Sequence, residues 1–199
     1  GVTSTAGPGI EGEFRQALEH GAVEIDASLT RDSEPQTRGH VIGTARYDID
    51  ETWRAGLDVR RSIDRTYLRR YNFGNEQTLT SQAFAEAFAD NHYFIANTYL
   101  FQGLDEDDDN DTIPIVAPKL DYAYTSDVDP LGGRTGVRLG FASFNRVEGS
   151  DTQRLSARAD WRLPLTGAIG ELYTVQAGAW GDAYHVNDFK PEQGAAHET

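Results

Sequence analysis

The sequence contains no cysteine and no methionine, and it has no long hydrophobic run. Without cysteine the chain forms no disulfide bond and offers no thiolate to a metal or a substrate. No stretch reaches the ~18 or more consecutive apolar residues that a membrane helix requires. Hydrophobic residues make up 38% of the chain. A thiol enzyme, a disulfide scaffold and a helical membrane protein are therefore poor interpretations.

Positive charge is also scarce, because 18 Lys and Arg face 32 Asp and Glu, for a net charge of −14. Such a chain repels phosphate backbones, so we expect no nucleic-acid partner. Phe, Trp and Tyr nevertheless make up 11% of the residues, which disfavours disorder. A small share of hydrophobic residues with many aromatic ones is typical of a barrel with a polar lumen, where every second strand residue meets lipid.

The chain begins at Gly1 without a methionine and without a charged, apolar leader. We therefore expect a fragment of a longer protein. Its 199 residues are expected to form one segment of a single domain.

Residues of alternating character dominate the chain, and the segment Arg154–Leu163 shows this most clearly. Its odd-numbered residues, among them Leu155 and Trp161, are apolar, and its even-numbered residues include four charged side chains. A β-strand places successive side chains on opposite faces, so such a segment has one apolar and one charged face.

The alternation predicts an all-β fold, an antiparallel meander of about ten long strands that is part of an outer-membrane β-barrel. The predicted strands span residues 10–18, 22–30, 40–49, 52–61, 79–89, 92–102, 113–125, 134–146, 152–163 and 170–184, and 187–199 is a polar tail or a truncated loop. Most are about ten residues long, which suits a tilted crossing of a bilayer better than the usual ~5–6 residues of globular strands. The connections are mostly short at one end of the strands and longer at the other.

Two loops contain unusual groups of charged residues. Residues 105–111 hold six acids, and Asp105, Asp107 and Asp109 begin with the spacing of a calcium loop. Position 110 is Asn instead of Gly and position 116 is Val instead of Glu, so a solvated loop tip is favoured over a metal site. Arg65, Arg69 and Arg70 interleave with tyrosines in a long connection. They could bind phosphate or sugar, but we favour a loop that pairs with luminal acids. Arg158 is a further candidate for polar contacts in the lumen.

Catalytic signatures are weak throughout. The five histidines have no metal-ligand spacing, and we interpret them as exposed or capping residues. A hidden glycosidase pair among the many carboxylates stays an open alternative, although no pair stands out. We predict no enzyme activity and no cofactor.

Several segments resemble the barrel domain of the LptD family, also called the organic solvent tolerance protein family, which assembles lipopolysaccharide in the outer membrane. They occur in family order over most of residues 40–186: Arg46–Asp50 with Trp53-Arg54, Ser62–Tyr71, Pro114–Tyr122, Arg154–Gly167 and Gly181–Val186.

This resemblance implies an outer-membrane location and the following partners: lipopolysaccharide (LPS), an LptE-like lipoprotein inside the barrel, a periplasmic Lpt bridge that docks on a separate N-terminal jelly-roll domain, and outer-membrane lipids. It implies a translocon wall that inserts LPS into the outer leaflet. The alternatives from strand physics alone are another, porin-like barrel and a soluble secreted β-sandwich that binds carbohydrate.

Overall fold

The computed structural model describes residues 9–31, 37–64, 76–105 and 107–187, and this part of the chain forms ten β-strands and no helix. The strands are β1 (Gly9–Leu18), β2 (Gly21–Arg31), β3 (Thr37–Asp48), β4 (Trp53–Ser62), β5 (Thr78–Ala89), β6 (His92–Gly103), β7 (Ile115–Thr125), β8 (Arg134–Asn145), β9 (Asp151–Thr166) and β10 (Leu172–Asn187). All ten predicted segments are strands.

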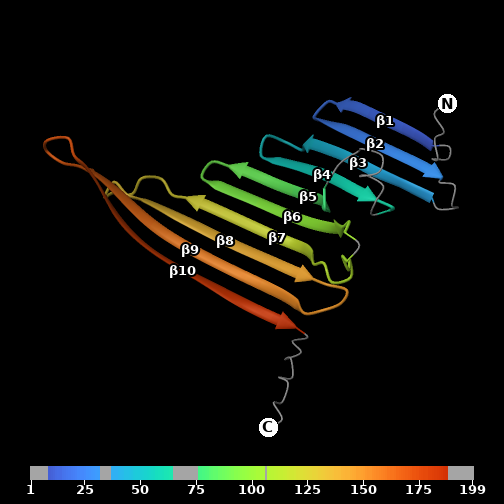
Figure 1. The fold of residues 1–199 in the computed structure, drawn as a ribbon. Coiled ribbons are helices and arrows are strands. Elements are labelled where there is room, and N and C mark those ends of the chain that lie inside the picture. The colour runs from blue at the N-terminus through green and yellow to red at the C-terminus, as the bar shows by residue number, and fades with distance from the viewer. Residues whose placement is uncertain (1–8, 32–36, 65–75, 106, 188–199) are drawn as a thin grey trace, which may run out of the picture.

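The strands form one sheet in which each pairs antiparallel with the next along the chain, in the order β1 to β10. Figure 1 shows this meander from β1 at one edge to β10 at the other, with those two strands unpaired with each other. The prediction of an all-β antiparallel meander is confirmed. The sheet is a single open layer, so the described residues do not form a β-sandwich.

The connections separate into two groups because successive turns of a meander lie at opposite ends of the strands. One end, called the short-turn end, has residues 19–20, 49–52, 90–91, 126–133 and 167–171. The other, the long-loop end, is where β2 leads to β3, β4 to β5, β6 to β7 and β8 to β9. At the short-turn end Asp90 adopts a positive φ of 41°, which lets residues 90–91 close a two-residue hairpin.

The register places side chains of one character on each face of the sheet. One face, called the charged face, carries Glu24, Arg46, Asp58, Glu86, Asp121, Arg138, Arg158 and Asp182. The opposite face, called the apolar face, carries Phe14, Ile25, Leu57, Ala85, Phe94, Leu120, Leu139, Ala159 and Ala179. Both faces are continuous across ten strands, since cross-strand partners always share a face.

Two local irregularities interrupt the ladders. The β6–β7 and β7–β8 registers shift around residues 117 and 118, where the Ala117–Pro118 peptide bond is cis. The β4–β5 pairing extends only from Trp53–Ala87 to Asp58–Gln82. Beyond it the Ser81 hydroxyl accepts a hydrogen bond from the Arg60 N–H (3.0 Å), and the Gln102 amide donates to the Ser62 carbonyl (2.7 Å). Side chains there replace the missing backbone pairs.

The apolar face is not covered by a second layer. Among the described residues, the buried apolar side chains are those of Leu79, Ala87, Leu104 and Val116. The accessible surface is 14280 Å² for 22.0 kDa, against about 9,300 Å² for a compact monomer of that mass. Leu57, Leu139 and Leu155 on the apolar face are each 44–54% exposed. Nothing in the described chain forms a closed hydrophobic core, so this face requires an apolar environment outside the sheet.

Within its described residues the chain has no helix that is long and apolar enough to cross a membrane.

Candidate functional site

Ion pairs between and along strands cover the charged face. They are Arg15 with Glu13 and Glu24, Arg38 with Asp64, Arg46 with Asp58, Arg54 with Glu86, Arg60 with Glu76, Lys119 with Asp121, and Arg154 with Asp182. Most involve half-exposed side chains, and each such pair adds about 0–1 kcal/mol at most. Their number gives this face both signs of charge but makes it a small source of stability.

Glu86 of β5 is the most enclosed carboxylate of these pairs, with 10% of its side chain exposed. Arg54 Nε donates to one oxygen, and the Tyr93 hydroxyl donates to the other at 3.1 Å. The Arg54 guanidinium also lies 4.8 Å from the centre of the Phe88 ring, and the Phe88 and Tyr93 rings contact each other in a tilted arrangement, 4.9 Å apart. Three strands therefore meet in one polar cluster, which sequence reasoning missed.

His40 corrects an expectation, because it is neither exposed nor a cap. Its side chain is fully buried on β3, where Nδ1 lies 2.7 Å from the Ser28 hydroxyl and Nε2 lies 2.8 Å from Asp26. Both partners come from β2, and the β2–β3 register aligns Ser28 with His40. The arrangement ties two strands together through side chains.

A glycine allows an arginine to stack on a ring of the charged face. The Arg46 guanidinium lies 5.2 Å from the centre of the Phe84 ring, across β4. Gly56 lies between them in the register, and a Cβ there would collide with the Phe84 ring. Phe84 thus stabilises a cation within the polar lining.

Aromatic residues gather on the apolar face near the short-turn end. Five of them lie within a few residues of the strand ends: Tyr47, Trp53, Phe94, Tyr122 and Tyr124. The Trp53 and Phe94 rings are 6.2 Å apart at 64°. A belt of amphipathic rings at one level is typical of a membrane–water interface.

Trp161 of β9 is held at this end by the turn at residues 126–133. Its indole N–H donates to Asp129 at 2.7 Å. The other oxygen of Asp129 accepts the backbone N–H groups of Leu131 and Gly133, both at 2.9 Å. These hydrogen bonds, that of Trp161 first, lower the pKa of Asp129 below its usual 3.8.

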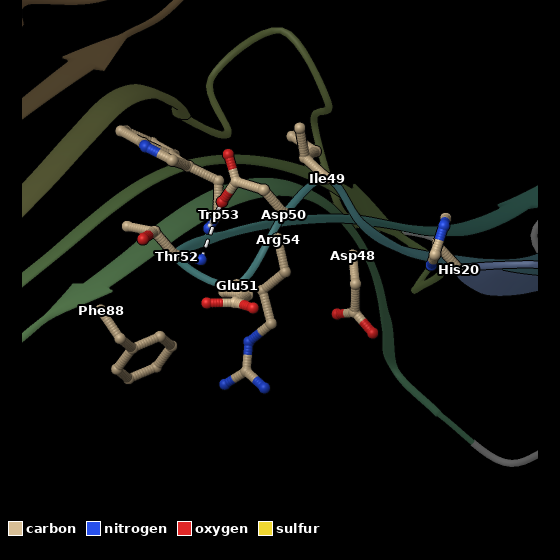
Figure 2. A pocket seen from close by; sticks show the side chains of 9 residues that line it. All are labelled: His20, Asp48, Ile49, Asp50, Glu51, Thr52, Trp53, Arg54 and Phe88. Carbon is tan, nitrogen blue, oxygen red and sulfur yellow. Dashed lines mark hydrogen bonds between the residues drawn. The ribbon is translucent and has the colours of Figure 1, made fainter.

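A cavity of about 490 Å³ opens at the short-turn end beside the β3–β4 hairpin. Figure 2 shows Arg54, Glu51 and Phe88 on one side of that hairpin and Trp53 with Ile49 on the other. Asp50 accepts the backbone N–H groups of Thr52 and Trp53, each at 2.7 Å, and so fixes the turn. The charged and titratable residues that line the cavity are three acids, Arg54 and His20.

The predicted site residues fall into three groups. Arg158 lies on the charged face, with Nε 3.6 Å from Asp160. Arg65, Arg69 and Arg70 lie outside the described residues. In the acidic loop, the Asp108 carboxylate accepts a hydrogen bond from the Asp105 backbone N–H at 3.0 Å. The Asp109 carboxylate accepts one from the Asp111 backbone N–H, also at 3.0 Å, as carboxylates in turns commonly do. Within the described part of the chain no three His or acidic residues gather as a metal site. A cation at Asp105, Asp107 and Asp109 therefore stays only a weak prediction.

Ten long antiparallel strands, an uncovered apolar face, an aromatic belt and a charged opposite face are together typical of membrane β-barrel proteins. The LptD family model, described as LPS transport system D, matches residues 36–199. The chain belongs to this family, whose members act in LPS transport and assembly, and the suspected resemblance is confirmed. No curated protein matches the chain.

Proposed function

We propose that this chain is part of the wall of an outer-membrane translocon that inserts LPS into the outer leaflet. The observation that carries the proposal is the separation of the two faces over ten strands, together with membership of the LptD family. In this arrangement the apolar face meets lipid and the charged face lines the lumen. The role is binding and passage without covalent chemistry, so no cofactor is required.

The physical case rests on the cost of reversing the faces. The charged face carries ion pairs on most strands, whose transfer to hydrocarbon would cost several kcal/mol per charge. The apolar face carries large aliphatic side chains that gain about 25 cal/mol for each Å² removed from water. A hydrated lumen and a lipid exterior satisfy both faces at once.

The partners belong to the same proposal. LPS is the transported molecule, an LptE-like lipoprotein occupies the lumen, and the periplasmic Lpt bridge delivers LPS through the N-terminal domain. The cell outer membrane is the proposed location, and its lipids contact the apolar face.

Two adjacent residues of β9 test which face of the sheet meets water and which meets lipid. Ser156 lies on the charged face and Ala157 on the apolar face, next to each other in mid-strand. Spin labels are attached to Ser156→Cys and Ala157→Cys in the intact protein, in a background without other cysteines, reconstituted in bilayers. We expect a water-soluble nickel complex to relax the label at residue 156, and oxygen dissolved in the bilayer to relax the label at 157. Nickel access at both positions would instead favour a soluble module.

The same two variants test transport. A bulky maleimide at residue 156 should block delivery of LPS to proteoliposomes, while the same reagent at residue 157 should leave delivery intact. A porin-like barrel would instead conduct ions in planar bilayers with no response to LPS, and that outcome would replace the translocon proposal.

A further inference from the structure

Arginines of β8 and β9 stand directly opposite one another on the charged face. Arg134 pairs with Arg162, and Arg138 pairs with Arg158. Like charges in directly opposed positions destabilise a sheet, because their Cβ atoms are only about 4.5–5.5 Å apart. Two such pairs on the same strand pair are unexpected in a chain with a net charge of −14.

The carboxylates nearby do not compensate this charge. Asp160 lies between two of the arginines, 3.6 Å from Arg158 and 3.2 Å from Arg162. Within the described residues, Arg134 and Arg138 form no ion pair. On the flanking strands Asp121 is paired with Lys119 and Asp182 with Arg154, each at 2.9 Å. Four guanidinium groups thus share one carboxylate, and a local positive excess remains.

Space for a ligand lies on both sides of this cluster. Arg134, Arg138 and Arg162 line a cavity of about 600 Å³. Arg138 and Arg158 line a second cavity of about 380 Å³. Gly136 and Gly140 alternate with the arginines on β8, where the Asp160 carboxylate lies beside Gly136 and the Ser156 hydroxyl beside Gly140. These volumes fall within the ~300–1,000 Å³ of small-ligand sites.

Trp180 of β10 supplies an aromatic surface beside the arginines. It pairs with Arg158 in the register, lines the smaller cavity, and is 80% exposed on the charged face. An exposed indole on a polar wall offers a flat apolar surface of the kind that covers the C–H face of a sugar ring. Guanidinium groups bind phosphate through two parallel hydrogen bonds.

We propose that Arg134, Arg138, Arg158, Arg162 and Trp180 form a subsite for an anionic saccharide, in which the guanidinium groups bind a phosphate and the indole stacks on the sugar. The subsite rests on the proposed function in one respect, which is that the charged face must be in contact with water. Bound phosphate removes the repulsion between the opposed arginines, so the cluster is stable when occupied and strained when empty.

The test measures binding to the intact protein in detergent by calorimetry. The probes are a phosphorylated disaccharide glycolipid, its dephosphorylated counterpart, inorganic phosphate and a polyglutamate peptide. We expect the double variant Arg134→Gln, Arg138→Gln to weaken binding of the phosphorylated glycolipid at least tenfold. The matched control is Arg15→Gln, Arg46→Gln, which removes two charged-face arginines that have carboxylate partners. It should leave the affinity unchanged.

Two further readouts separate binding from a structural role. The double variant should unfold at the same or a higher denaturant concentration than the wild type, because it loses repulsion. Trp180→Ala should weaken the glycolipid but not inorganic phosphate, which would assign the indole to the sugar.

Several results would overturn the subsite. The first is an unchanged affinity of the double variant for the phosphorylated glycolipid. The second is that the wild type binds the dephosphorylated probe, or inorganic phosphate alone, as tightly as the phosphorylated glycolipid. The third is equally tight binding of polyglutamate, which would assign the cluster to an acidic protein segment. If the label at Ser156→Cys is not accessible to water, the proposed function fails as well. If it is accessible and the arginine variants bind normally, only the subsite fails.

Discussion

A single arginine placed on the apolar face should destabilise the protein in the membrane, and Ala159→Arg is the most informative position. Ala159 lies between Val137 and Ala179 in the register, in the middle of β9. Its two cross-strand neighbours on that face are small or aliphatic and offer no carboxylate to a new guanidinium. An arginine side chain spans roughly 7 Å, whereas the midplane of an apolar band about 25 Å tall lies about 12 Å from either edge. A guanidinium near the midplane therefore cannot reach water by extending.

The expected cost follows from this depth. A basic residue on the lipid face costs about 2–4 kcal/mol near the midplane. Since every 1.4 kcal/mol is a factor of ten, the folding equilibrium should fall about 30-fold to 700-fold. Leu57→Arg, in the middle of β4, should lose a similar amount plus the burial of the leucine side chain.

The assay is denaturant unfolding of the intact protein in lipid vesicles. Arg158→Gln is the control on the charged face, one residue away, and should cost no more than about 1 kcal/mol because its ion pair with Asp160 is long, at 3.6 Å, and the variant also loses the repulsion from Arg138. Ala159→Leu should be neutral, since it adds apolar surface toward lipid. Equal losses in Ala159→Arg and Arg158→Gln would show that the faces are assigned incorrectly.

The remaining predictions concern two polar clusters. Glu86→Gln removes the carboxylate charge that Arg54 and Tyr93 share, and should cost about 1–3 kcal/mol in the same unfolding assay. The control is Arg60→Gln, whose ion pair with Glu76 is half-exposed, and it should cost less than about 1 kcal/mol. A larger loss in Arg60→Gln than in Glu86→Gln would contradict the argument from burial. Because the pKa of Asp129 is lowered in the folded protein, its contribution to the 126–133 turn is complete above the usual value of 3.8 and is lost as the pH falls through the lowered pKa. The measurement is the fluorescence emission of Trp161 in a variant in which Trp53 and Trp180 are replaced by Phe. The emission should shift as the pH falls below 3.8, and Asp129→Asn should abolish this shift. A shift that survives in Asp129→Asn would have another origin.

The presence of a strand, and the face on which each of its side chains lies, were predictable wherever one face is clearly charged. In β9 the alternation of Leu155, Ala157 and Ala159 with Arg154 and Arg158 assigns both faces directly from the sequence. Strand ends were less predictable, because β9 continues through Pro164 to Thr166. A proline lacks an N–H donor and normally signals the end of a strand.

Strand β5 shows what a sequence alone cannot decide. Its alternation places Ala83, Ala85 and Ala87 against Phe84, Glu86 and Phe88, and hydrophobicity alone would turn the phenylalanines toward lipid. The pairing of Trp53 with Ala87 instead puts both rings on the charged face, under Arg46 and Arg54. The Arg54–Glu86–Tyr93 cluster and the burial of His40 depend on register in the same way. Register comes from long-range pairing, which no local pattern contains.

The strands differ in length, and this gives the wall an uneven height. Strands β9 and β10 each have 16 residues, while β1 and β4 have 10. At a tilt near 45°, 16 residues rise about 37 Å and 10 residues about 23 Å, against an apolar band about 25 Å tall. Figure 1 shows the turn of the β9–β10 hairpin extending beyond the turns of its neighbours. The β9–β10 hairpin therefore projects beyond the hydrocarbon at the short-turn end, and its sixteen paired residues connect that projection continuously to the long-loop end of the sheet.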